Sequence, residues 1–142
     1  MNISDIKSVN WQLSVLGLGN IAEGIDDIRQ CIQLILTTTK GSDPMRPLFG
    51  SDIWQHVDKP VNIASALVSA EIVDALTKWD PRIVLKKIIH NTDGSKIDFE
   101  LTIELIESGE TTQISFYIDR QQQIEGSFVG RNFSNGFDFG FN

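Results

Sequence analysis

The sequence is poor in several residue types, and each shortage excludes a class of function. Cys31 is the single cysteine, so no disulfide can form within the chain. There are 12 basic residues against 19 acidic ones, and the net charge of −7 makes nucleic acid and anionic membranes poor partners. No apolar run approaches the roughly 18 residues of a transmembrane helix. The first twelve residues lack the pattern of a signal peptide, so we expect assembly in a cytoplasm.

Residues that could support chemistry are also scarce. His56 has Asp52 and Asp58 nearby, but only His90 could add a second imidazole, which is too little for a metal site. The segment 17–22 matches a loose dinucleotide fingerprint, yet no βαβ unit follows it, so we interpret its glycines as a turn. No nucleophile elbow is present, and the sequence singles out no glycosidase-like pair of carboxylates. We therefore expect no catalytic residue, no cofactor, no metal, and a protein that is not an enzyme.

Apolar periodicity predicts the secondary structure. Isoleucines at helical spacing predict a helix over about 24–38, with Cys31 as a buried free thiol beside its apolar stripe. A second helix is expected at about 62–79, with Asn62 as its N-cap and its end set by Pro81. The period then changes to two over 82–90, 97–105 and 112–118, separated by turns at 91–95 and 107–110. We predict an α+β fold, with two main helices packed on a three-stranded or slightly larger antiparallel meander.

The C-terminal segment does not continue this pattern. Its phenylalanines alternate with Gly, Asn, Ser and Asp instead of aliphatic residues. The chain is thus divided into a domain over 1–120 and an irregular, Phe/Gly-rich extension over 121–142. The extension either folds back on its own domain or docks on a partner; we expect partner binding through Phe128, Phe133, Phe137, Phe139 and Phe141.

The junction between the second helix and the sheet has an unusual composition. A plain connector would use Gly or Asn, but this one reads Asp80-Pro81-Arg82. One interpretation is a helix stop with a surface ion pair of little energetic value. The other is that Pro81 holds the planar fork of Arg82 toward a carboxylate on another chain. The residues alone favour neither.

Two stretches resemble the W-like baseplate wedge family of contractile phage tails, which is related to the sheath-initiating baseplate component of type VI secretion systems. They are ILTTTKGSDPMRPLFGSDI (35–53) and ALTKWDPRI (75–83). The matching positions are Leu36, Thr38, Gly41, Pro47, Phe49, Gly50, Asp52, Pro81 and Arg82, and the resemblance covers about 20–120. The family usually has Glu where this chain has Asp80.

The resemblance implies a structural role without catalysis. It predicts a wedge subunit of a tail baseplate, assembled in the host cytoplasm, which contacts the wedge core bundle and nucleates the sheath by accepting sheath strands. Expected partners are other wedge proteins, the sheath protein and the tail tube or hub. The expected contact residues in the shared region are Phe49, Gly50, Asp80, Pro81 and Arg82. The alternatives are a type VI secretion baseplate component and a lysozyme-like peptidoglycan hydrolase.

Overall fold

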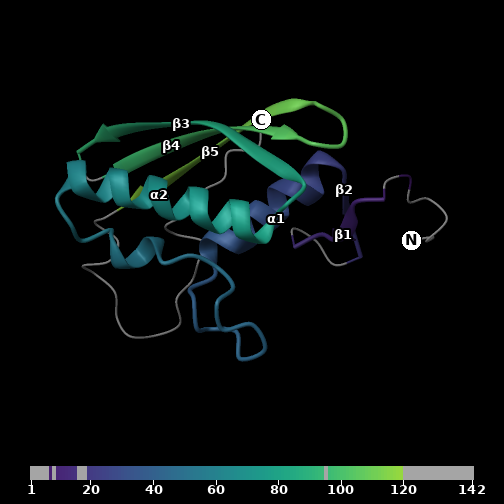
Figure 1. Ribbon diagram of the computed structural model, residues 1–142, viewed down its shortest axis with the longest axis horizontal. Helices are drawn as coiled ribbons and strands as arrows, with labels where there is room; N and C mark the ends of the chain where they lie inside the picture. Colours follow the sequence, from purple (N-terminus) through teal and green to yellow (C-terminus); the bar gives the residue numbers. More distant parts are fainter. Residues whose placement is uncertain (1–6, 8, 16–18, 95, 120–142) are drawn as a thin grey trace.

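The computed structural model describes residues 7, 9–15, 19–94 and 96–119. Within these residues, a short hairpin leads into one helix, a long loop and a second helix, and a three-stranded sheet follows (Figure 1). The elements are β1 (Trp11–Leu13), β2 (Ile21–Glu23), α1 (Ile25–Thr37), η2 (Ile53–Gln55), α2 (Val61–Trp79), β3 (Ile83–Asp93), β4 (Lys96–Leu105) and β5 (Thr111–Asp119). The predicted α+β class is confirmed.

Both predicted helices are confirmed within a few residues. Helix α1 buries the isoleucine stripe that predicted it, and Asp26 and Asp27 lie in its first turn, where the helix dipole favours negative charge. Helix α2 begins at Val61 directly after Pro60, so Asn62 lies inside the first turn and the predicted N-cap is wrong. A proline preceding the helix sets this start, because its fixed φ is compatible with entry into a helix. Neither helix in the described part of the chain is long and apolar enough to cross a membrane.

The predicted meander is also confirmed. Strands β3, β4 and β5 pair in that order, each antiparallel to the next. Strand β3 continues to Asp93 and β4 starts at Lys96, so the predicted five-residue turn is mostly strand. A β-bulge between Leu85 and Lys87 shifts the register of β3 on β4. Within the part of the chain that the structure describes, this order leaves β3 and β5 at the two edges of the sheet.

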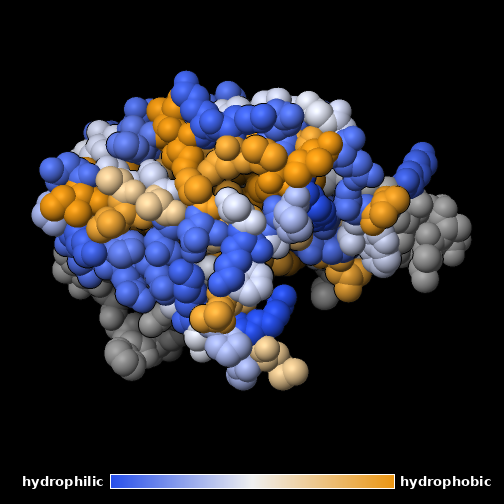
Figure 2. All heavy atoms as spheres, in the orientation of Figure 1, coloured by the Kyte–Doolittle hydropathy of each residue, from blue (hydrophilic) through white to orange (hydrophobic). Residues whose placement is uncertain are grey.

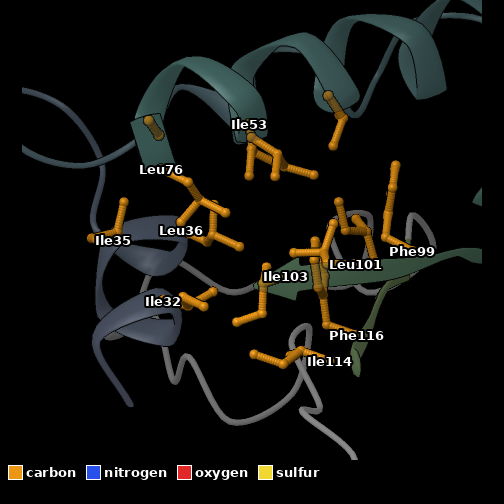
Figure 3. Packing of buried hydrophobic residues seen from close by; sticks show 14 of the residues in the cluster. Ile32, Ile35, Leu36, Ile53, Leu76, Phe99, Leu101, Ile103, Ile114 and Phe116 are labelled. Carbon is orange, nitrogen blue, oxygen red and sulfur yellow. The ribbon is translucent and has the colours of Figure 1, made fainter. Parts of the chain in front are cut away.

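The hydrophobic core lies between the helices and one face of the sheet, as Figure 3 shows. Strand β4 supplies alternate residues from Ile97 to Leu105, each at most 9% exposed. Ile32 and Leu36 of α1, together with Ile72 and Leu76 of α2, meet this face and are at most 1% exposed. Burial of such side chains stabilises the fold by about 1.5–3 kcal/mol each. The core therefore holds the end of α2 and the start of β3 in a fixed relation.

The N-terminal hairpin lies outside the predicted elements. Its strands β1 and β2 are three residues long each, which is too short to give a periodic signal. Buried Gln30 of α1 holds the hairpin, because its amide donates to the Leu13 carbonyl at 2.7 Å and accepts from the Val15 N–H at 2.9 Å. The amide side chain thus fixes the end of β1 and the residue two positions after it to α1.

Candidate docking site at the helix–sheet junction

Helix α2 ends at Trp79, as Pro81 predicts. Asp80 follows with φ −126° and ψ 86°, outside the helical region, while its N–H still donates to the Leu76 carbonyl at 3.0 Å. Its carboxylate turns back and accepts a hydrogen bond from the Arg82 N–H at 3.2 Å. The junction is therefore a hydrogen-bonded turn from which the Arg82 side chain leaves in a fixed direction.

Arg82 contacts two buried carboxylates of its own chain. Its Nε and Nη2 donate to the two carboxylate oxygens of Asp80 at 2.9 and 3.0 Å, which is a bidentate pair. Its Nη1 donates to Oδ2 of Asp27 at 2.7 Å. The side chains of Asp80 and Asp27 are 3% and 4% exposed, whereas that of Arg82 is 34% exposed. One guanidinium thus joins the start of α1, the end of α2 and the start of β3.

The surroundings hold Arg82 in its charged form. The hydrogen bonds that the guanidinium donates to Asp80 raise its pKa far above the ordinary value, partial burial opposes this, and the bond it donates to Asp27 raises the pKa further. Cys31 lies beside the same guanidinium. Its side chain is half-buried, whereas the sequence predicted a buried thiol. Burial raises the pKa of its thiol above the ordinary value. We call Asp27, Asp80 and Arg82 the junction triad.

The junction triad corrects both interpretations of the sequence. Arg82 does not form an ordinary surface ion pair, because the two carboxylates that it binds, those of Asp80 and Asp27, are both buried. Nor is the fork left for another chain, because its donors already bind Asp80 and Asp27. Sequence reasoning missed Asp27, and no local signal marks it, because 55 residues separate it from Arg82 and only the fold brings the two together.

The loop between α1 and η2 places Phe49 beside the junction. Gly50 has φ +104°, and a Cβ there would collide with the Thr38 carbonyl, so the sequence requires glycine. Next to it, the Ser51 N–H donates to that carbonyl at 2.9 Å, which ties the loop to the end of α1. The ring of Phe49 then meets Trp79 edge to face, with centroids 5.2 Å apart, and Arg46 lies over Phe49 at 4.4 Å.

These residues line one shallow depression of about 420 Å³ between α1, the loop and the junction. Its lining residues are Cys31, Leu34, Ile35, Arg46, Phe49, Trp79, Asp80, Pro81 and Arg82. Four of the five contact residues predicted in the shared region thus lie together, while Gly50 is not among the lining residues and shapes the loop instead. The five phenylalanines predicted at 128–141 lie outside the described residues.

A charge cluster fixes the other side of the same loop. Lys40 lies 3.0 Å from Oε2 of Glu71 and 3.4 Å from Oδ2 of Asp52. Burial lowers the pKa of Lys40, but the hydrogen bond and charge of Glu71 outweigh it and the pKa is raised overall. Burial raises the pKa of Glu71, but hydrogen bonds from Lys40 and from the Asp52 N–H lower it overall. The cluster therefore holds the loop to α2 mainly through its ionised form.

The depression, with Phe49 and Trp79 in its lining, lies in the same domain as a sheet whose described part ends in two edge strands, and edge strands can pair with another chain. The sequence model of the family described as "Baseplate wedge protein gp25" matches residues 22–110. The chain belongs to this family, and the predicted resemblance is confirmed. The match includes the whole of the junction triad and most of the sheet. A search of curated proteins found no match.

Solved structures agree with this family. A chain of the post-contraction pyocin R2 baseplate is 30% identical, with a TM-score of 0.59, over 67% of this chain and 97% of that one. A protein from Geobacter sulfurreducens described as a tail lysozyme is 24% identical, with a TM-score of 0.61, over 67% and 89%. A chain of the anti-feeding prophage baseplate is 19% identical, with a TM-score of 0.59, over 69% and 82%. The last two likenesses show the fold alone.

Proposed function

We propose that this chain is a non-catalytic structural subunit of a contractile-tail baseplate wedge, assembled in the host cytoplasm, on which the first sheath ring is nucleated. The observation that carries the proposal is the family match over 22–110, which contains the depression and most of the sheet. The likeness to a pyocin R2 baseplate chain over 97% of that chain supports the same role. Partners in this role are other wedge proteins, the sheath protein and the tail tube or hub.

In this proposal, two surfaces of the chain contact different partners. The depression at the junction contacts the wedge core bundle, with Phe49, Pro81 and the exposed part of Arg82 as contacts. The edges of the β3–β4–β5 sheet accept strands from sheath subunits, because an edge strand presents unpaired backbone groups that pair readily with another chain. The junction triad fixes the two surfaces relative to each other, since Arg82 directly precedes β3.

The proposal is tested by assembling particles without this chain and then restoring it. We expect particles lacking it to carry no sheath attached to a baseplate in negative-stain micrographs, and the wild-type chain to restore attachment. Restoration by a Phe49→Ala variant that still folds would contradict a contact at the depression. Normal sheath attachment without the chain would refute the proposed function.

A hydrolase is the second candidate, because a relative of the same fold is described as a tail lysozyme. Asp27 and Asp80, the buried carboxylates at the junction, do not favour a hydrolase. Both are bound to Arg82 and so are not free to act on a substrate. A glycosidase requires two carboxyl groups that flank a substrate. A turbidity assay with purified peptidoglycan decides the matter. We expect no clearing, and clearing that a single carboxylate substitution abolishes would establish the hydrolase instead.

A further inference from the structure

The N-terminal hairpin presents its apolar side to solvent. Polar and apolar residues alternate over 9–15, and each apolar one is exposed: Val9 at 90%, Trp11 at 46%, Leu13 at 65% and Val15 at 57%. An antiparallel strand at the surface ordinarily turns its apolar residues to the core and its polar residues to water. This segment does the reverse, and Figure 2 shows hydrophobic atoms at the surface of the hairpin, at the right of the view.

The polar residues of the segment are half-buried and bound to the domain. Asn10 donates to Oε2 of Glu107 at 3.1 Å, and Gln12 donates to the Asp27 carbonyl of α1 at 3.0 Å. Together with the two hydrogen bonds of Gln30, these contacts fix which side of the hairpin faces α1. A slip of one residue would turn every side chain to the other face and break them. The exposed apolar side is therefore specified by the fold.

Strand β2 extends the same side of the hairpin. Trp11 lies opposite Glu23, and Leu13 lies opposite Ile21, so each pair shares a face of the two-stranded sheet. We call Val9, Trp11, Leu13, Val15 and Ile21 the hairpin face. Six residue steps from 9 to 15 make it up to about 20 Å long, and two strands about 5 Å apart make it about as wide as one helix.

The hairpin face lies outside the part of the chain that defines the family. The family match begins at residue 22, whereas the face is formed by residues 9–21. Neither the depression nor the edges of the three-stranded sheet include these residues. Because a contiguous exposed apolar surface marks a contact with another molecule, the face requires a partner of its own.

The charges around the hairpin face indicate the chemistry of that partner. Glu23 lies on the face itself, Asp26 follows it in α1 with a side chain 71% exposed, and Glu107 accepts a hydrogen bond from the hairpin. Of the basic neighbours, Lys7 binds Glu23 through its backbone N–H, and Arg29 pairs with Asp26 at 3.4 Å. The surroundings are thus acidic, like the chain as a whole at −7. Two such faces would repel each other, whereas a basic partner would be attracted.

From these observations we infer that the hairpin face binds an amphipathic helix of another protein of the baseplate, with its apolar stripe over Trp11 and Leu13 and its lysines or arginines beside Glu23. A helix fits because an apolar sheet face is ordinarily covered by a helix or a second sheet, and about 13 helical residues match the length of this face. The inference rests on the proposed function, since the partner belongs to the same particle. It adds a contact that the shared family fold does not contain.

Photocrosslinking in assembled particles identifies the partner. Leu13→p-benzoylphenylalanine places a photoreactive group on the hairpin face, and the same replacement of Ile63, which is 48% exposed at the start of α2, is the control. Purified particles are irradiated, and crosslinked peptides are sequenced by mass spectrometry. We expect the Leu13 variant to capture one helical segment of a different baseplate protein, with Lys or Arg within a turn of the crosslink. The control should not capture that segment.

Four other results would overturn the inference. They are a crosslink to a second copy of the chain, a crosslink to residues 121–142 of the chain itself, a crosslink to a segment that is acidic or not helical, and no crosslink at all. The proposed function is checked separately, by the presence of the wild-type chain in purified baseplates. If the chain is absent there, both ideas fail; if it is present and Leu13 captures no such helix, the inference alone fails.

Two substitutions separate the apolar and the charged parts of the contact. Leu13→Asp should leave the melting temperature nearly unchanged and lower incorporation into particles about tenfold or more, because the contact would bury a charge. Glu23→Gln keeps an acceptor for the Lys7 N–H but removes the charge, so incorporation should fall about twofold to fivefold and depend less on salt.

Matched controls make the same changes elsewhere. Ile63→Asp adds a carboxylate at the start of α2, and Glu100→Gln removes one from β4, so both should be incorporated as the wild type is. Melting curves of all four variants show that each one folds. Normal incorporation of folded Leu13→Asp, or a loss equally large with Ile63→Asp, would overturn the inference.

Discussion

Removing the charge of Arg82 should destabilise the isolated protein and not only its assembly. In Arg82→Met the aliphatic part remains, but Asp27 and Asp80 lose three charged hydrogen bonds. Breaking a buried ion pair costs about 3–5 kcal/mol. Because a third of the Arg82 side chain reaches solvent, water can partly replace it, and we expect a loss of about 2–4 kcal/mol. That is a large part of the roughly 5–15 kcal/mol that stabilises a typical domain.

The assay is urea unfolding of the purified chain, followed by circular dichroism. A double-mutant cycle with Asp27→Asn isolates the pair, and we expect a coupling energy of about 1–3 kcal/mol. Arg82→Lys should recover only part of the loss, because a single ammonium cannot reproduce the bidentate pair with Asp80. The control is Lys86→Ala, whose ion pair with Glu104 is 49% and 36% exposed and should contribute about 1 kcal/mol or less. A loss for Arg82→Met no larger than that of the control would refute the junction triad as a brace.

Three further changes test the loop and the tail. Gly50→Ala should cost about 2–4 kcal/mol in urea unfolding, since it adds a clash with Thr38 to positive-φ strain, whereas Gly109→Ala, at φ +68° with open space around it, should cost about 1–2 kcal/mol; equal losses would exclude the clash. The pKa of Glu71 is lowered, so its stabilising contribution is complete above its ordinary value of 4.5 and disappears as the pH falls through the folded-state pKa. The stability difference between wild type and Glu71→Gln should therefore be constant from pH 5 to 8 and shrink in acid, and a difference that grows in acid would reverse the argument. Deleting 126–142 should leave the melting temperature nearly unchanged and weaken incorporation into baseplates; a large drop in melting temperature would mean that the tail folds on its own domain.

The sequence predicted what depends on local periodicity, and it failed where distant groups meet. The helices and the meander follow from apolar spacing, and the end of α2 follows from the restriction that Pro81 places on Asp80. Asp27 could not be paired with Arg82 in this way, because 55 residues separate them and only the fold brings them together. The same holds for Ile63 and Val73 of α2, which are apolar like the core residues and yet 48% and 45% exposed in the fold.

Phe49 and Trp79 lie between these two cases. Both stood in motifs that the sequence marked, and the resemblance predicted Phe49 as a contact residue. Their edge-to-face packing depends on the loop closure at Gly50, which no periodic signal encodes. The shared depression is thus a product of the fold, although four of its nine lining residues were predicted as contact residues.

The central claim is that this chain joins the baseplate wedge to the first sheath ring through its sheet. A cryo-EM map of the assembled baseplate with its first sheath ring attached tests that claim most directly. We expect the β3–β4–β5 sheet to continue into an added sheath strand at one of its edges. A map in which sheath is attached while both edges of this sheet remain bare would contradict the account.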